Sequence, residues 1–405
     1  MISLSKARKR TKPRKAPEMP RMLDTSVFDE VLRRGNPRLN RQLADQLAGF
    51  VAAAETPETE RRAVIPYLLR LLSGRDVLVR RRIAERLAAS AVELDPDLLF
   101  TIVADEDSIA LPFLKDLRIL SCRRQLAIYR VGDEARRMAL VGRSDVCEAL
   151  CRLVAKDGEA KVVAALLDNA NAVLSADDLK RIYVRFRDVP AIVERLMQRR
   201  DLPAEVRLTH VRLARQRLEQ AMRRGELPAS VALRRNIIAT EERAMAEILC
   251  RVADDPVTLK ATLKFMIRRE LLTPAVVFRA ACRGKVTVLA QAMALLAGSS
   301  RRRIERALKR DGRVARRYLQ KVYRKSGLPA EGEALAMALF AVHAERPEGM
   351  PAKAFGREVL MHLMAQGEEL SVAEKAAAAE LLAEFTDGET KVLARRVSGD
   401  LRKAA

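Results

Sequence analysis

Hydrophobic residues recur at intervals of three and four along nearly the whole chain after residue 24, and this spacing predicts amphipathic α-helices. In the segment 76–90, for example, Val79, Ile83 and Leu87 fall on one face, while most of the neighbouring arginines fall off it. Such segments are short, and many begin at an Asp or Ser that can cap a helix. A unit of this size cannot bury its own apolar face. The pattern therefore predicts an all-α fold, an irregular α-solenoid of stacked antiparallel helix pairs.

Changes in this pattern divide the chain into three parts. Residues 1–23 combine basic residues with prolines and carry no apolar stripe, so we expect a disordered basic arm. Residues 24–225 are expected to form the helical-repeat half, and residues 226–405 a second, more basic C-terminal helical half. The predicted boundary is the Pro-containing turn at 225–230, which separates two long helical patterns.

Two of the predicted helices have distinctive features. The segment 203–224 aligns Val211, Ala214, Leu218 and Met222, which we expect to form its buried face. Another helix should begin at Ser371, because a Glu follows three residues later and completes the sequence pattern of a capping box.

Several segments resemble an uncharacterised bacterial family of HEAT-like helical-repeat proteins, family 2336 of the domains of unknown function. The resemblance is carried by Val79 to Ala89, Asp105 to Leu114, Ala139 to Arg143, Leu166 to Asn169 and the turn Arg199 to Pro203. It implies a HEAT-like fold from about residue 30 to beyond residue 340 and no particular activity. The chain departs from the family pattern at Arg136, where a His is expected, and at Val141, where an Ala is expected.

The charge balance indicates which classes of partner the chain attracts. Lys and Arg total 76 against 53 Asp and Glu, which gives a formal net charge of +23. A field of this sign attracts nucleic acid, an anionic membrane surface or an acidic protein face. The alternative is that the arginines simply solvate helix surfaces.

Two segments concentrate this charge. The candidate anion-binding residues are twelve cations between residues 301 and 325, set against only Glu305 and Asp311: Arg301, Arg302, Arg303, Arg306, Lys309, Arg310, Arg313, Arg316, Arg317, Lys321, Arg324 and Lys325. The candidate basic arm contributes Lys6, Arg8, Lys9, Arg10, Lys12, Arg14 and Lys15. Tyr318 and Tyr323 lie within the first cluster, where they would either stack on bases or fill the groove between helices.

The residues that most often carry catalysis or bind metals form no recognisable motif. The histidines His210, His343 and His362 lie far apart, and the sequence contains no metal-binding, phosphate-loop or nucleophile-elbow motif. We therefore expect no enzyme activity, no cofactor and no metal. An odd number of widely spread cysteines suggests reduced thiols rather than disulfides: Cys122, Cys147, Cys151, Cys250 and Cys282.

These observations favour a non-catalytic helical-repeat scaffold that binds another macromolecule. A protein partner ranks first, because solenoid surfaces mostly bind proteins. Nucleic acid, held through phosphate contacts by residues 301–325 and the arm, is the alternative, and an anionic membrane surface ranks third. No small-molecule substrate is expected. The sequence also predicts a cytoplasmic location, because the cysteines are expected to be reduced and the N-terminal segment lacks the apolar core of a secretory signal; no apolar stretch is long enough to cross a bilayer.

Overall fold

The computed structural model describes residues 26–309, 313–345, 351–366 and 370–404, so the predicted basic arm lies outside the described residues. Within these ranges the chain forms 23 α-helices and one short 3-10 helix, η1, and no strand. The predicted all-α fold is therefore confirmed. The helices form two compact units, Met1–Leu196 and Met197–Ala405.

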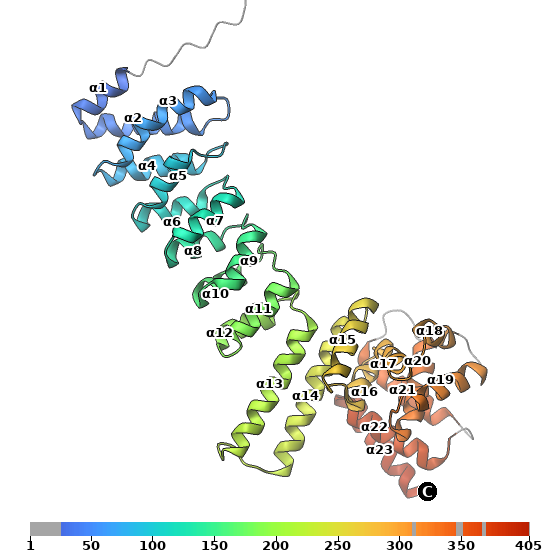
Figure 1. Cartoon of the computed structure of the whole chain (residues 1–405). Helices are drawn as coiled ribbons and strands as arrows, with labels where there is room; N and C mark the ends of the chain where they lie inside the picture. Colours follow the sequence, from blue (N-terminus) through green and yellow to red (C-terminus); the bar gives the residue numbers. More distant parts are fainter. Residues whose placement is uncertain (1–25, 310–312, 346–350, 367–369, 405) are drawn as a thin grey trace, which may run out of the picture. The chain divides into compact units, whose positions relative to one another are not determined.

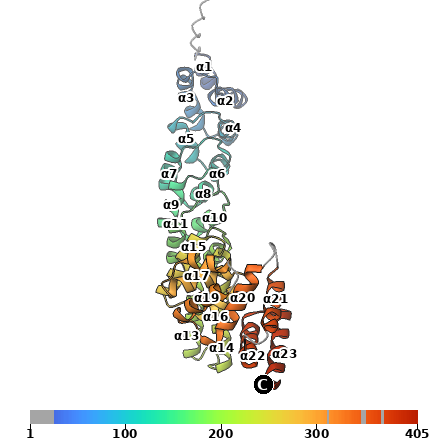
Figure 2. The same ribbon diagram turned by 90° about the vertical axis from the view of Figure 1, so that its right-hand side faces the viewer.

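The first unit is a two-layered stack of short helices (Figure 1). Its helices are α1 (Ser26–Arg34), α2 (Pro37–Ala52), α3 (Glu58–Leu72), α4 (Val77–Ala88), α5 (Pro96–Val103), α6 (Asp107–Asp116), α7 (Cys122–Val131), α8 (Glu134–Val141), α9 (Glu148–Asp157), α10 (Ala160–Asp168), α11 (Ala176–Phe186) and α12 (Pro190–Gln198), which ends just past the boundary. The even-numbered helices α2 to α10 each pack on the next, and the odd-numbered helices α3 to α11 form the second layer (Figure 2).

Helix α4 shows how the sequence produces these elements. The side chain of Asp76 accepts a hydrogen bond from the backbone N–H of Leu78 at 2.9 Å and caps the helix. Val79, Ile83 and Leu87 then face inward and are buried, as the spacing predicts. The apolar stripe faces α2, α3 and α6, so burial of this stripe holds one helix pair against the next.

A disulfide links two helices of the odd-numbered layer. Cys122, the first residue of α7, is bonded to Cys147, the N-cap residue of α9, and their Cα atoms lie 5.6 Å apart. The prediction that all the cysteines are reduced is therefore wrong for this pair. Helices α7 and α9 pack together, which brings these two cysteines together across 25 residues of sequence. Cys250 and Cys282 keep their thiols, and burial raises the pKa of both.

We predict that reducing this disulfide lowers the free energy of unfolding of the first unit by about 3 kcal/mol, because the bond closes a loop of 25 residues in the unfolded chain. Urea denaturation with and without a phosphine reductant measures the difference. A Cys122→Ser/Cys147→Ser variant should show no response to the reductant. Equal unfolding midpoints for the oxidised and reduced wild-type protein would contradict the prediction.

The second unit begins with a long helix hairpin and continues into a larger bundle. Its helices are α13 (Ala204–Arg223), α14 (Val231–Val252), α15 (Pro256–Arg268), α16 (Pro274–Cys282), α17 (Val286–Leu296), α18 (Arg301–Leu308), α19 (Arg313–Lys325), η1 (Ala330–Gly332), α20 (Glu333–Glu345), α21 (Ala352–Ala365), α22 (Val372–Phe385) and α23 (Gly388–Ala404). The core lies around α16, α17, α20 and α22, and every residue from Val276 to Cys282 is buried.

The hairpin corrects two predictions. The turn at 225–230 joins α13 to α14, and these helices pack on each other, so the division between the units does not fall at this turn but after Leu196. The predicted buried face of α13 is also wrong in part. Met222 is buried, but Ala214 and Leu218 are exposed, and Leu218 has 41% of its surface accessible. Helix α13 packs mainly on α14, and one neighbour cannot cover the whole apolar stripe.

A basic face as the candidate functional site

Helices α18 and α19 carry the candidate anion-binding residues on a narrow apolar base. Ile304 and Ala307 are buried on α18, and Leu319, Val322 and Tyr323 are buried on α19. The two helices pack on each other and on α17, and both also contact α20 (Figure 1). Because only a few side chains point inward, most of the cations must point to solvent.

The exposed cations of this pair form what we call the basic face. On α19, Arg313, Arg317 and Lys321 follow one another at intervals of four, so they share one side of the helix, opposite the buried residues. All members of the basic face are exposed: Arg302, Arg303, Arg306, Lys309, Arg313, Arg317, Lys321, Arg324 and Lys325. Nine of the twelve predicted residues are thus exposed on this packed helix pair.

Within the described residues, almost none of this charge is neutralised by a carboxylate. Arg324 forms an ion pair with Glu333 at 2.8 Å, and this carboxylate raises the pKa of the Arg324 guanidinium. No carboxylate among the described residues pairs with the other eight cations. Like charges four residues apart, such as Arg302 with Arg306 or Arg313 with Arg317, each destabilise a helix by about 0.2–0.5 kcal/mol. A bound polyanion would remove this repulsion.

The remaining three predicted residues comprise two that are engaged within the second unit and one that lies outside the described residues. Arg301 is only 23% exposed and donates to Glu305 at 2.5 Å and to Gln291 at 3.0 Å. Arg316 is half-buried and donates to Gln366 at 3.2 Å. Arg310 lies outside the described residues, as do the seven residues of the predicted basic arm.

Of the two tyrosines of this segment, one is a core residue and the other packs against the core. Tyr323 is completely buried, and its hydroxyl donates a hydrogen bond to the carbonyl oxygen of Pro329 at 2.6 Å. Burial raises the pKa of this phenol well above its usual value, so it stays protonated and keeps this bond. Tyr318 is half-buried and packs against the core of the second unit. The interpretation that these tyrosines fill the groove between helices is the one that the structure supports.

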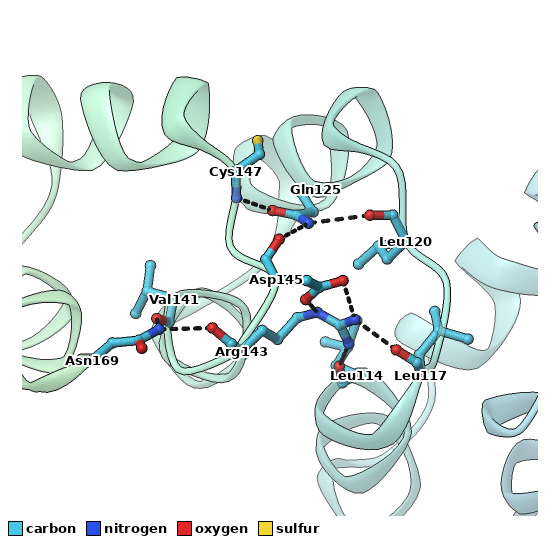
Figure 3. A network of polar contacts seen from close by, with 9 residues as sticks. All are labelled: Leu114, Leu117, Leu120, Gln125, Val141, Arg143, Asp145, Cys147 and Asn169. Carbon is cyan, nitrogen blue, oxygen red and sulfur yellow. Dashed lines mark hydrogen bonds and ion pairs between the residues drawn. The ribbon is translucent and has the colours of Figure 1, made fainter. Parts of the chain in front are cut away.

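Arginines elsewhere in the chain are used differently. In the first unit, Arg143 is 3% exposed and donates to the carbonyl oxygens of Leu114 and Leu117 at the end of α6, and to both carboxylate oxygens of Asp145 (Figure 3). Asn169 donates to the carbonyl oxygen of Arg143 itself at 2.7 Å. These bonds satisfy carbonyl groups that a helix end leaves without an intrahelical partner.

Other arginines of the first unit also donate to carbonyl oxygens near helix ends. Arg136 donates to the carbonyl oxygens of Val103 and Asp105, and Arg185 donates to those of Ala155 and Gly158. Arg136, Arg143 and Arg185 therefore stabilise the junctions between successive helices of the first unit. This role was not predicted from the sequence; the signal that could have revealed it is an arginine within two residues of a helix end, as Arg136, Arg143 and Arg185 all are.

The long hairpin of the second unit does not extend the basic face. Arg212 and Arg215 of α13 both pair with Glu241 of α14, which is buried, at 3.4 and 2.5 Å. Helix α13 packs on α14 and α15, whereas α18 and α19 pack on α17 and α20. Arg212 and Arg215 are thus engaged within the hairpin and add no free charge to α18 and α19.

Comparison with protein-family models finds a match over residues 109–373, well over half of the chain, to a family described as an uncharacterised protein conserved in bacteria, DUF2336. The chain belongs to this family. The family match spans both the Arg143 network and the basic face, and its description assigns no activity. Searches among curated proteins and among solved structures find no match.

Among the described residues of this family member, no group of three or more His, Cys, Asp or Glu side chains lies close enough together to hold a metal ion. None of the described helices combines the length and apolar character that crossing a membrane requires.

Proposed function

We propose that the protein is a non-catalytic helical-repeat protein that binds nucleic acid through phosphate contacts at the basic face. The observation that carries this proposal is the set of eight exposed cations on α18 and α19 that have no carboxylate partner among the described residues. Five of the eight are arginines, and one planar guanidinium group can donate to two phosphate oxygens at once. In the first unit, Arg136, Arg143 and Arg185 donate to backbone carbonyls between helices, so these three are not available to a ligand.

The composition of the basic face favours nucleic acid over an anionic membrane. A helix that lies in a membrane interface buries large apolar side chains among the lipids. On α18 and α19, Val314 is the one large apolar side chain that is strongly exposed, with 85% of its surface accessible, among the residues described. A surface with many cations and almost no exposed apolar area is suited to a phosphate backbone in water.

A variant with Arg302, Arg306, Arg313 and Arg317 changed to Ala tests this function. We expect the wild-type protein to bind mixed-sequence oligonucleotides with a dissociation constant of about 1–100 μM near physiological salt. Fluorescence anisotropy across a range of salt concentrations gives the slope of log affinity against log salt. Loss of four phosphate contacts should make this slope shallower by about 3–4 and weaken binding at low salt by about two to three orders of magnitude.

A matched control keeps the total charge of the variant constant. Arg234, Arg235, Arg243 and Arg268 are exposed arginines of the second unit outside the basic face, and changing all four to Ala removes the same charge. Equal loss of affinity in the two variants would mean that net charge, not the basic face, attracts the nucleic acid. No binding above about 0.1 M salt by the wild-type protein would refute the proposal. Binding only to phosphatidylserine vesicles would assign the face to membranes instead.

A protein partner is the second candidate, and it would use the first unit. A hollow of about 620 Å³ lies between α4 and α6, with Ala84, Ile109 and Phe113 among the residues of its floor and Arg81 and Asp116 among those at its rim. An apolar floor with charges of both signs around it is typical of surfaces that bind a protein segment. The four basic-face substitutions leave this hollow intact, so a partner bound there would be retained by the variant.

A further inference from the structure

A cavity of about 450 Å³ lies beside the basic face, between α17, α18 and the end of α20. Its apolar walls include Ala290 of α17, Leu308 of α18 and Ala344 of α20. The volume falls within the range of about 300–1,000 Å³ that is usual for small-ligand sites. All three helices pack on one another within the second unit, so the walls are held by the same core.

The polar groups of this cavity are oriented by the protein. Arg301 Nε donates to Glu305 Oε1 at 2.5 Å, and Arg301 Nη1 donates to Gln291 Oε1 at 3.0 Å. Gln291 is buried, so these two bonds fix the plane of the guanidinium group at the cavity wall. The Glu305 carboxylate lines the same wall as an acceptor, and His343 adds a flat imidazole ring from α20.

The cavity is continuous with the basic face. Arg301, Glu305 and Lys309 follow at intervals of four on α18, and this row lines the cavity. Arg302 and Arg306 each lie one position further along the sequence and form the next row, which is exposed to solvent. Lys309 belongs to both, because it lines the cavity and is exposed with the other cations. A strand with phosphates along the exposed row would therefore have its bases next to the cavity.

We propose that this cavity takes one unstacked nucleobase of a single-stranded nucleic acid whose phosphates lie along the basic face. A base has an apolar flat body and polar edges, which match apolar walls, a fixed guanidinium plane and a carboxylate acceptor. The Glu305 carboxylate disfavours a bare phosphate at the same position. A duplex would have to unpair and unstack a base first, which costs a few kcal/mol, so single strands should bind more tightly. This inference rests on the proposed function.

The experiment compares three ligands of equal length: a mixed-sequence single strand, its duplex and a single strand of abasic residues. Wild-type protein should bind the single strand about tenfold more tightly than the other two at physiological salt. Ala344→Trp places an indole at the cavity wall from an exposed position, so it should bring single-strand affinity down to the abasic level without disturbing the fold. The matched control is Ala261→Trp at an exposed position on α15, which should change nothing.

The outcomes separate this inference from the proposed function. Equal affinity for all three ligands, or single-strand affinity unchanged in Ala344→Trp, would overturn the base site while leaving the phosphate contacts in place. If none of the three ligands binds, both the base site and the proposed nucleic-acid binding are refuted. The last measurement tests binding of a mixture of mononucleotides to the wild type and to Ala344→Trp. If mononucleotides bind, lose that binding in Ala344→Trp, and the single strand shows no preference, the cavity takes a free nucleotide and our assignment to a strand is wrong.

Discussion

Changing Arg143 to Ala should lower the free energy of unfolding of the first unit by about 2–5 kcal/mol, because one substitution removes the donors from two buried helix-end carbonyls and leaves Asp145, which is exposed, without its ion pair. Arg143 is 3% exposed and donates to the carbonyl oxygens of Leu114 and Leu117. It also binds both oxygens of Asp145, at 2.7 and 2.9 Å. Urea denaturation followed by circular dichroism measures the loss, and hydrogen exchange should place it at the α6 to α9 junction.

The neighbouring polar groups explain why this position should be so sensitive. Gln125 donates to the carbonyl oxygens of Leu120 and Asp145 and accepts from the backbone N–H of Cys147 (Figure 3). The Asp145 carboxylate therefore binds Arg143, and its backbone carbonyl accepts from Gln125, which in turn binds the start of α9 at Cys147. Removing the guanidinium leaves buried acceptors without donors, which costs about 1–3 kcal/mol for each group.

Two further variants test whether the whole guanidinium is required. Arg143→Lys should recover little stability, because a single ammonium group cannot reproduce the planar geometry that reaches two carbonyls and a carboxylate together. Arg130, on α7, is exposed, and Arg130→Ala should cost less than about 0.5 kcal/mol. A cost for Arg143→Ala no larger than that for Arg130→Ala would show that water replaces the network without loss.

Local sequence predicted the helices well, because the signals that begin and bury a helix lie within a few residues. Asp76 caps α4, and Ser371 forms the predicted capping box with Glu374 at the start of α22. The clustering of cations on α18 and α19 was also predictable, since a narrow apolar stripe leaves the other sides of a helix to solvent.

Features that depend on packing between distant segments were not predictable. The Cys122–Cys147 disulfide forms because α7 and α9 are neighbours in one layer. The cavity beside the basic face needs His343 of α20 next to Glu305 of α18, and no local motif records that proximity. Leu218 fits a buried stripe by spacing, but its helix lacks a neighbour on that side and leaves it exposed. In each case the contacts of the residue depend on which helix packs against its own, and its own segment does not record this.

The core beneath the basic face should be equally sensitive to the loss of one aromatic ring. Phe278 of α16 is 2% exposed and stacks on Phe385 of α22, with ring centroids 5.7 Å apart. Gly332 lies directly against this ring and against the hydroxyl of Tyr323, so closely that a Cβ at Gly332 would lie 2.7 Å from Phe278 Cζ. Phe278 thus supports α19 through Tyr323 and η1, and deletion of its ring would leave a cavity that the surrounding helices cannot easily close.

Phe278→Ala should therefore lower the free energy of unfolding of the second unit by about 3–5 kcal/mol, whereas Phe278→Leu should cost less than about 1.5 kcal/mol because it keeps most of the volume. Urea denaturation gives the two values, with Val314→Ala as a surface control, since Val314 is 85% exposed. Where Phe278→Ala is still folded, its affinity for oligonucleotides should equal that of the wild type, because the cations of the basic face are unchanged. A stability loss as small as that of Val314→Ala would mean that α16 and α22 close over the missing ring, and that the aromatic stack is not what supports α19.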